Sequence, residues 1–155
     1  MESDKCCAVF GHREVDEKKV ILKDKLYFYF EDMIVNKKVG HFYFGGFGEF
    51  DEICREIVTN LKSKYSHIKR YYVCEDYKFI DRPYKRPRWL KDEDYDQFIY
   101  FDMRYTGFNK RIYFRNCEII DHSDYAVFYI RYKNNSGAYK AFEYARRKEI
   151  EIIQA

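Results

Sequence analysis

Short apolar runs alternate with segments of helical periodicity along this chain, and that alternation restricts its fold more than any other feature. The apolar runs predict strands at 6–10, 42–44, 68–74, 98–101, 125–130 and 150–153. Between them, apolar residues recur three and four positions apart, as on one face of a helix, at 22–34, 50–61, 138–145 and, more weakly, 110–122. Alternating strands and helices predict an α/β fold with a mainly parallel central sheet covered by helices on both faces.

The chain has 155 residues, which suits one domain with a hydrophobic core of its own. We therefore expect a single Rossmann-like, doubly wound domain over 1–155, with its sheet burying Val9, Phe44, Val127 and Phe128. The stretch 75–97 departs from the alternation, since it is crowded with charge and holds both prolines and the only tryptophan, Trp89. It is predicted to be an irregular insertion, either a lid over a bound nucleotide or a solvated loop.

Three residues are predicted to mark the ends of helices. Asp16 is expected to cap the first helix, with Val15 and Val20 in contact across the cap. Gly40 is expected to end the same unit. Ser136 is expected to cap the last helix.

Composition and charge limit the classes of function. The net charge of +3, from 29 basic and 26 acidic residues, is too balanced to indicate nucleic-acid binding by itself. Five cysteines without a C-x-x-C pair are typical of a reduced, cytoplasmic protein. No apolar run reaches the length of a membrane span, and the N-terminus lacks a signal-peptide pattern. The four histidines lack the spacing of a metal site, and we expect neither a metal nor a cofactor.

Glycines gather where three predicted strands run into helices, in "FGHR" (10–13), "GGFGEFDE" (45–52) and "NNSGAY" (134–139). In an open parallel sheet these junctions lie at the same edge, where ligands bind. Either the glycines only make tight turns, or they let an anion such as a nucleotide phosphate reach the N–H groups of the helix N-termini. The second interpretation is favoured because five of the seven glycines share this edge. The ligand-binding residues predicted in these junctions are Gly11, His12, Arg13, Gly45, Gly46, Phe47, Gly48, Glu49, Ser136 and Gly137.

Polar side chains at these junctions have both a structural and a functional interpretation. Arg13 binds phosphate and His12 donates to a ribose or phosphate oxygen, or else both residues lie in a solvated loop. The acids Glu49, Asp51 and Glu52 complement the dipole of the helix they begin, or else Glu49 or Asp51 accepts hydrogen bonds from ribose hydroxyls.

Four blocks, "CAVFGHR", "FYFGGFGEFD", "RNCEIIDHSDYAVFYI" and "SGAYKAFEYA", together resemble the SLOG superfamily, especially its YpsA-like group. The superfamily includes the DprA/Smf proteins and the LOG phosphoribohydrolases. The resemblance implies a Rossmann-like sheet, a nucleotide-derived ligand and a homodimer. It also implies that Arg115 and Glu143 match the catalytic arginine and glutamate of the LOG enzymes, and Asn116 beside Arg115 is expected to face the crevice. The proline, threonine and other glycines of the LOG motif around Glu143 are missing here, and Glu52 is a weaker candidate for the same role.

Two functions from different classes follow. The first is a binding protein that senses or sequesters a nucleotide-derived small molecule, such as an ADP-ribose-like ligand or a cyclic nucleotide signal. The alternative is a phosphoribohydrolase acting on nucleoside 5'-monophosphates, in which Arg115 holds the phosphate and Glu143 stabilises the transition state or activates water. Binding of DNA, as in the DprA group, is less favoured because the charge is balanced.

Overall fold

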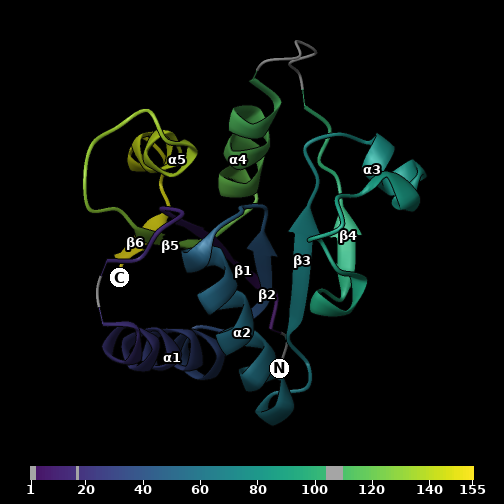
Figure 1. Ribbon diagram of the computed structural model, residues 1–155. Helices are drawn as coiled ribbons and strands as arrows, with labels where there is room; N and C mark the ends of the chain where they lie inside the picture. The colour runs from purple at the N-terminus through teal and green to yellow at the C-terminus, as the bar shows by residue number, and fades with distance from the viewer. Residues whose placement is uncertain (1–2, 17, 104–109) are drawn as a thin grey trace.

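A computed structural model of the protein describes residues 3–16, 18–103 and 110–155. Its described strands form one six-stranded sheet in the order β4-β3-β2-β1-β5-β6, and every neighbouring pair is parallel (Figure 1). The strands are β1 Lys5–Gly11, β2 Val39–Phe44, β3 Lys69–Val73, β4 Gln97–Ile99, β5 Tyr125–Tyr129 and β6 Glu151–Gln154. The order runs outward from β1 in both directions, so the switch point of this doubly wound sheet lies between β1 and β5.

Helices cover both faces of the sheet, as the alternation predicts (Figure 1). α1 (Lys19–Asn36) and α2 (Glu49–Lys64) pack against one face, and α4 (Arg111–Asp121) and α5 (Gly137–Arg146) against the other. Successive residues of β1 and β5 point to opposite faces, so that Val9 and Val127 belong to one core cluster while Phe10 and Phe128 belong to the second. The predicted burial of the sheet residues is confirmed for Val9, Phe44, Val127 and Phe128.

The segment 75–97 contains three short helical turns, α3 (Lys78–Asp81), η1 (Pro83–Lys85) and η2 (Asp92–Asp94). It is attached to the sheet by a small apolar cluster in which Leu90 packs with Tyr72 and Cys74. At its end, Asp96 accepts hydrogen bonds from the backbone N–H of Arg70 at 2.7 Å and from the Arg70 guanidinium at 3.1 and 3.2 Å. These contacts hold the segment beside β3 at both ends of the strand, through Tyr72 and Cys74 at its carboxyl end and through Arg70 near its amino end.

The ends of α1 differ from the prediction. The helix begins at Lys19, so Asp16 does not cap it, and Val20 is 71% exposed, so it makes no hydrophobic staple with Val15. At the other end, the residue with positive φ is Lys38 (φ 58°), whereas Gly40 lies inside β2. A side chain at Gly40 would collide with the backbone of Ser3, so a close approach of two chain segments, and not a helix end, explains this glycine. The Ser136 cap of α5 is confirmed, because Ser136 Oγ accepts from the N–H of Tyr139 at 3.1 Å.

None of the described helices combines the length and the apolar character that crossing a membrane requires.

Candidate functional site

A cavity of about 560 Å³ lies at the carboxyl edge of the sheet, at the switch point between β1 and β5. All three glycine junctions line it, together with the start of α4 and with Trp89 from the segment 75–97. The lining includes these predicted site residues: Gly11, His12, Arg13, Gly45, Gly46, Phe47, Arg115, Asn116, Ser136 and Gly137. Gly11 and Gly137, which are 126 positions apart in the sequence, therefore meet at one place, as expected for a doubly wound sheet.

Buried polar side chains concentrate around this cavity. Among the described residues, the buried polar or charged ones are His12, Asp51, Arg70, Arg115 and Asn116. All of them except Arg70 line the cavity. Removing a polar or charged side chain from water is costly, so a protein retains such groups where they are paired or where they meet a ligand.

Arg115 contributes the buried positive charge of the cavity. Its Nε and Nη2 donate to Asn116 Oδ1 at 3.2 and 3.0 Å, and its Nη1 lies 3.4 Å from the Val73 carbonyl and 3.5 Å from a Glu75 carboxylate oxygen. A side chain at Gly45 would place its Cβ 2.9 Å from the Arg115 Cζ. Gly45 therefore makes room for the guanidinium, which Asn116 and Glu75 hold in a fixed orientation.

His12 is held in its neutral form. Its Nε2 accepts a hydrogen bond from the backbone N–H of Arg131 at 3.0 Å, and its ring stacks on Tyr132 with centroids 4.1 Å apart. Burial, and then the positive charge of Arg131, lower the pKa of His12 below its ordinary value. Because Nε2 is the acceptor, the neutral ring carries its proton on Nδ1 and offers a hydrogen-bond donor.

The glycines at the sheet edge leave room mainly for the protein's own groups, which corrects the interpretation that all of them make room for an anion. An added side chain would collide with the Phe50 ring at Gly11 and with the Asp51 carboxylate at Gly46. Gly48 has φ +125°, and its Cβ would lie 2.6 Å from the Arg13 Cα. Gly137 alone of this group faces open space, since its Cβ would meet only Asn116 Nδ2 at 3.9 Å.

The N-terminus of α5 provides backbone donors at the open side of the cavity. Gly137 and Ala138 begin the helix and line the cavity. N–H groups in the first turn of a helix have no partner within the helix, and they carry a partial positive charge. Together with Arg115, they make this side of the cavity suited to an anion.

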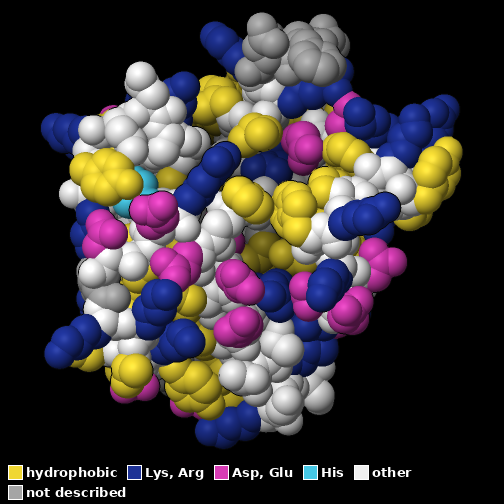
Figure 2. Space-filling view, viewed as in Figure 1, with side chains coloured by type: hydrophobic (Ala, Val, Ile, Leu, Met, Phe, Trp, Pro, Cys, Tyr) yellow, Lys and Arg dark blue, Asp and Glu magenta, His cyan; other side chains and the backbone are white. Residues whose placement is uncertain are grey.

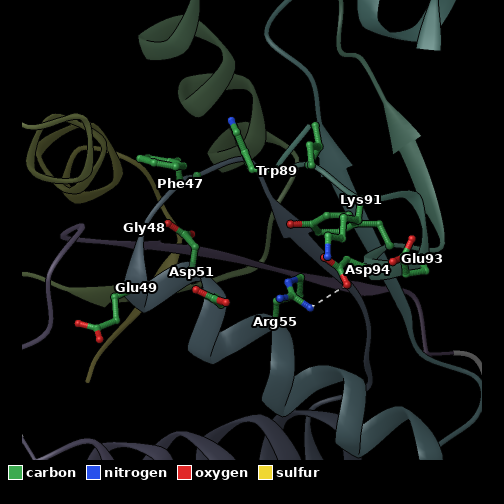
Figure 3. Close-up of a pocket in the computed structure, with 13 residues that line it drawn as sticks. Phe47, Gly48, Glu49, Asp51, Arg55, Trp89, Lys91, Glu93 and Asp94 are labelled. Atoms are coloured by element: carbon green, nitrogen blue, oxygen red, sulfur yellow. Dashed lines mark ion pairs between the residues drawn. The ribbon is translucent and has the colours of Figure 1, made fainter. Parts of the chain in front are cut away.

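A second cavity of about 570 Å³ lies between α2 and the segment 75–97 (Figure 3). It shares Gly46, Phe47, Asp51 and Trp89 with the first, so the two cavities adjoin. Phe47 and Trp89 lie at their boundary with ring centroids 5.1 Å apart, and both are about half exposed. Figure 2 shows this face of the molecule hollowed near its middle, with Asp and Glu side chains on both sides of the hollow.

Three acidic candidates differ in position. Glu143 lines neither cavity; it accepts from Tyr139 Oη at 2.5 Å and from Arg146 at 3.3 Å. Glu49 and Glu52 line the second cavity only, as does the predicted site residue Gly48. Glu49 is occupied, because it accepts from the Val15 N–H at 2.7 Å and pairs with Lys19.

Sequence reasoning missed the aromatic and acidic residues that complete the first cavity. Tyr72 lies near the carboxyl end of β3, Glu75 follows that strand, and Tyr132 comes shortly after β5. Applying the same rule to β3 and β5, that residues at the carboxyl ends of parallel strands meet at one edge, would have identified them. No group of three His, Cys, Asp or Glu side chains within the described ranges is arranged to hold a metal ion.

No protein-family model matches this sequence, and no curated protein matches it. Solved structures do match by fold. DNA processing protein A (DprA) from Streptococcus pneumoniae has a TM-score of 0.65 and 14% identity, covering 97% of this chain and 50% of that one. DprA from Helicobacter pylori, described with a single-stranded DNA binding mode, has a TM-score of 0.61 and 14% identity, covering 97% and 65%. The protein TM1055 has a TM-score of 0.56 and 14% identity, covering 97% and 92%.

The chain thus spans 50% and 65% of the lengths of the two DprA structures. DprA is one of the proteins that the SLOG resemblance names, and at 14% identity these structures show that the chain shares their fold. The six parallel strands with helices on both faces confirm the Rossmann-like fold class.

Proposed function

We propose that this protein binds a nucleotide-derived small molecule in the cavity at the carboxyl edge of its sheet, as a sensor or a sequestering protein. The observation that carries this proposal is the convergence of four buried polar side chains, His12, Asp51, Arg115 and Asn116, on a single cavity at the switch point. Such a group of buried polar residues at the ligand edge of a doubly wound sheet is typical of a binding site.

The proposed ligand has an anionic part and an aromatic part. Arg115 and the first turn of α5 suit a phosphate or pyrophosphate, because both present N–H donors and positive charge. The exposed faces of Phe47 and Trp89 suit a nucleobase, because aromatic side chains stack on bases. An ADP-ribose-like molecule or a cyclic nucleotide carries both parts.

Hydrolysis of a nucleoside monophosphate remains the alternative function. This activity requires Glu143 to reach the bound substrate. Arg115 lies in the cavity as this activity requires, whereas Glu143 does not line it and is hydrogen-bonded to Tyr139 and Arg146. A general acid or base must come within hydrogen-bonding reach of the reacting atoms. The position of Glu143 therefore favours binding over hydrolysis.

The sole tryptophan offers a direct test, because Trp89 lines both cavities. Titration of the protein with nucleoside monophosphates, ADP-ribose, cyclic ADP-ribose isomers and a short single-stranded oligonucleotide would be followed by Trp89 fluorescence and calorimetry. We expect at least one small molecule to bind below the millimolar range. The absence of binding across the panel would contradict the proposal, and release of free base, detected by chromatography and abolished in Glu143→Gln, would favour the hydrolase. Tight binding of the oligonucleotide alone, falling steeply with salt, would indicate a DNA-binding role instead.

A further inference from the structure

We infer that Asp51 is a ligand-recognition residue whose carboxylate accepts hydrogen bonds from the ribose hydroxyls of the bound molecule. This inference rests on the proposed function and specifies what binds next to the anion. It also resolves the choice between Glu49 and Asp51 as the acceptor at the start of α2.

The Asp51 carboxylate is buried but incompletely hydrogen-bonded. Its residue is 8% exposed, and its Oδ1 is the only buried side-chain nitrogen or oxygen in the described part of the chain that has no hydrogen-bond partner. Arg70 shows the usual arrangement, because this buried guanidinium is paired with the carboxylate of Asp96. An unpartnered buried oxygen costs free energy in the empty protein, so its retention points to a group supplied from outside.

Asp51 lies where a ligand in either cavity would reach it. It belongs to the first turn of α2, and Figure 3 shows it at the second cavity. It also lines the first cavity, so it lies where the two adjoin. Gly46 keeps this place open, because any side chain there would collide with the Asp51 carboxylate. A molecule with its phosphate at Arg115 and its base at Phe47 and Trp89 would bring its sugar to the region between them, beside Asp51.

Neither a dipole role nor an ion-pair role accounts for this carboxylate. Glu49 and Glu52 already provide negative charge in the first turn of α2 from more accessible positions. Arg115 attracts Asp51 electrostatically, but its hydrogen bonds go to Asn116, Val73 and Glu75. Glu49 is an unsuitable acceptor because Val15 and Lys19 occupy it.

The electrostatic surroundings give this role a proton signature. Burial raises the pKa of Asp51 to about 7, while the positive charge of Arg115 acts in the opposite direction. The other ionisable groups that interact with it are Cys54 from α2 and Tyr95 from the segment 75–97, and burial raises the pKa of both. His12 also lines the first cavity, and burial lowers its pKa, which favours the neutral ring. A hydroxyl donor favours the ionised carboxylate, so binding below pH 7 should release a proton from Asp51.

The test compares Asp51→Asn with Asp96→Asn, using ADP-ribose as the probe, because its pyrophosphate and ribose groups do not titrate near neutral pH. Asp96 is the control: it is an aspartate that lines neither cavity and whose two carboxylate oxygens are satisfied by Arg70. We expect Asp51→Asn to lower the affinity at least about tenfold without lowering the melting temperature. Asp96→Asn should lower the melting temperature and leave the affinity within about twofold.

Calorimetry of the wild-type protein in buffers of different ionisation enthalpy should detect proton release at about pH 6 and little at about pH 8, and Asp51→Asn should abolish the difference. Unchanged affinity in Asp51→Asn, or a loss of stability like that of Asp96→Asn, would overturn the inference and leave the proposed function standing. A wild-type protein that fails to bind ADP-ribose overturns the inference as well, and failure of the whole ligand panel overturns the proposed function with it.

Discussion

Two glycines at the sheet edge show how one residue type serves different purposes. A side chain at Gly46 would collide with the Asp51 carboxylate, whereas a side chain at Gly137 would enter open space beside Asn116. The two positions were alike in the sequence, as glycines at strand-to-helix junctions. Their difference depends on which distant residue packs against each one, and this information is absent from local sequence.

We predict opposite effects for the two glycines. Gly46→Ala should lower the free energy of unfolding by on the order of 1–3 kcal/mol, because it crowds a buried site. Gly137→Ala should leave the unfolding free energy unchanged or slightly higher, since alanine favours a helix. If Gly137 makes room for an anion, the same variant should weaken ligand binding. Urea unfolding together with calorimetry checks both variants, and an equal loss of stability at the two positions would contradict the packing described here.

The buried Asp51 also predicts how stability depends on pH. Its pKa is raised to about 7 from an ordinary value of 3.8, so the folded protein holds a proton that the unfolded chain releases in the window between these values. Stability therefore falls as the pH rises through this window, and the full penalty is present above pH 7. Asp51→Asn should remove the penalty, so it should stabilise the protein more at about pH 8 than at about pH 4. Urea unfolding of both proteins at each pH measures this difference. A gain that is equal at both pH values would contradict the raised pKa.

At the scale of elements, the strands and the later helices could be predicted because their apolar periodicity is strong and local. The predicted start of α1 was wrong: aspartate is a common N-cap residue, but Asp16 lies three positions before the helix begins at Lys19. The prediction that Gly40 ends this helix was also wrong. From the sequence alone, a glycine that avoids a collision with Ser3 looks the same as a glycine that ends a helix. The failure at Gly40 shows that a tertiary contact can decide where a glycine is needed, and local sequence does not reveal such a contact.

The cap of α5 gives a prediction at this scale. Ser136 Oγ accepts from the Tyr139 N–H, so Ser136→Ala should lower the free energy of unfolding by about 1 kcal/mol. Ser63 is the matched control, because it is an exposed serine within α2. Ser63→Ala should leave stability unchanged or slightly increased, since alanine has the higher helix propensity. Thermal or urea unfolding of the two variants decides this, and equal stabilities would show that the cap contributes nothing.

At the scale of the whole molecule, the sequence indicated which edge of the sheet carries the site, because parallel strands place their carboxyl ends together. Arg115, Asn116 and His12 were identified from their positions and from the SLOG resemblance, and all three line the cavity. The sequence did not predict that the site divides into two adjoining cavities, or that Trp89 contacts Phe47. Both depend on how the segment 75–97 folds back over α2, and no local pattern encodes that path.

The segment 75–97 is expected to respond to ligand as a unit. Its apolar attachment through Leu90 is small, while Trp89 extends to the boundary of the two cavities. Ligand bound against Trp89 should therefore increase the hydrogen-exchange protection of this segment, with little change in β1 and β5. Hydrogen exchange with and without a ligand from the panel measures this. Equal protection of the segment in both states would remove the proposal that it acts as a lid.

The central claim is that the buried charge at the switch point binds the ligand, and two arginines allow it to be tested directly. Arg115 and Arg70 are both buried and hydrogen-bonded, but only Arg115 lines the cavity. Calorimetric affinity is measured for Arg115→Lys and Arg70→Lys with the ligand that binds the wild-type protein most tightly. We predict that Arg115→Lys weakens binding at least about tenfold, because lysine lacks the planar fork of donors, and that Arg70→Lys leaves affinity within about twofold. Equal affinities in the two folded variants would contradict the assignment of this cavity as the binding site.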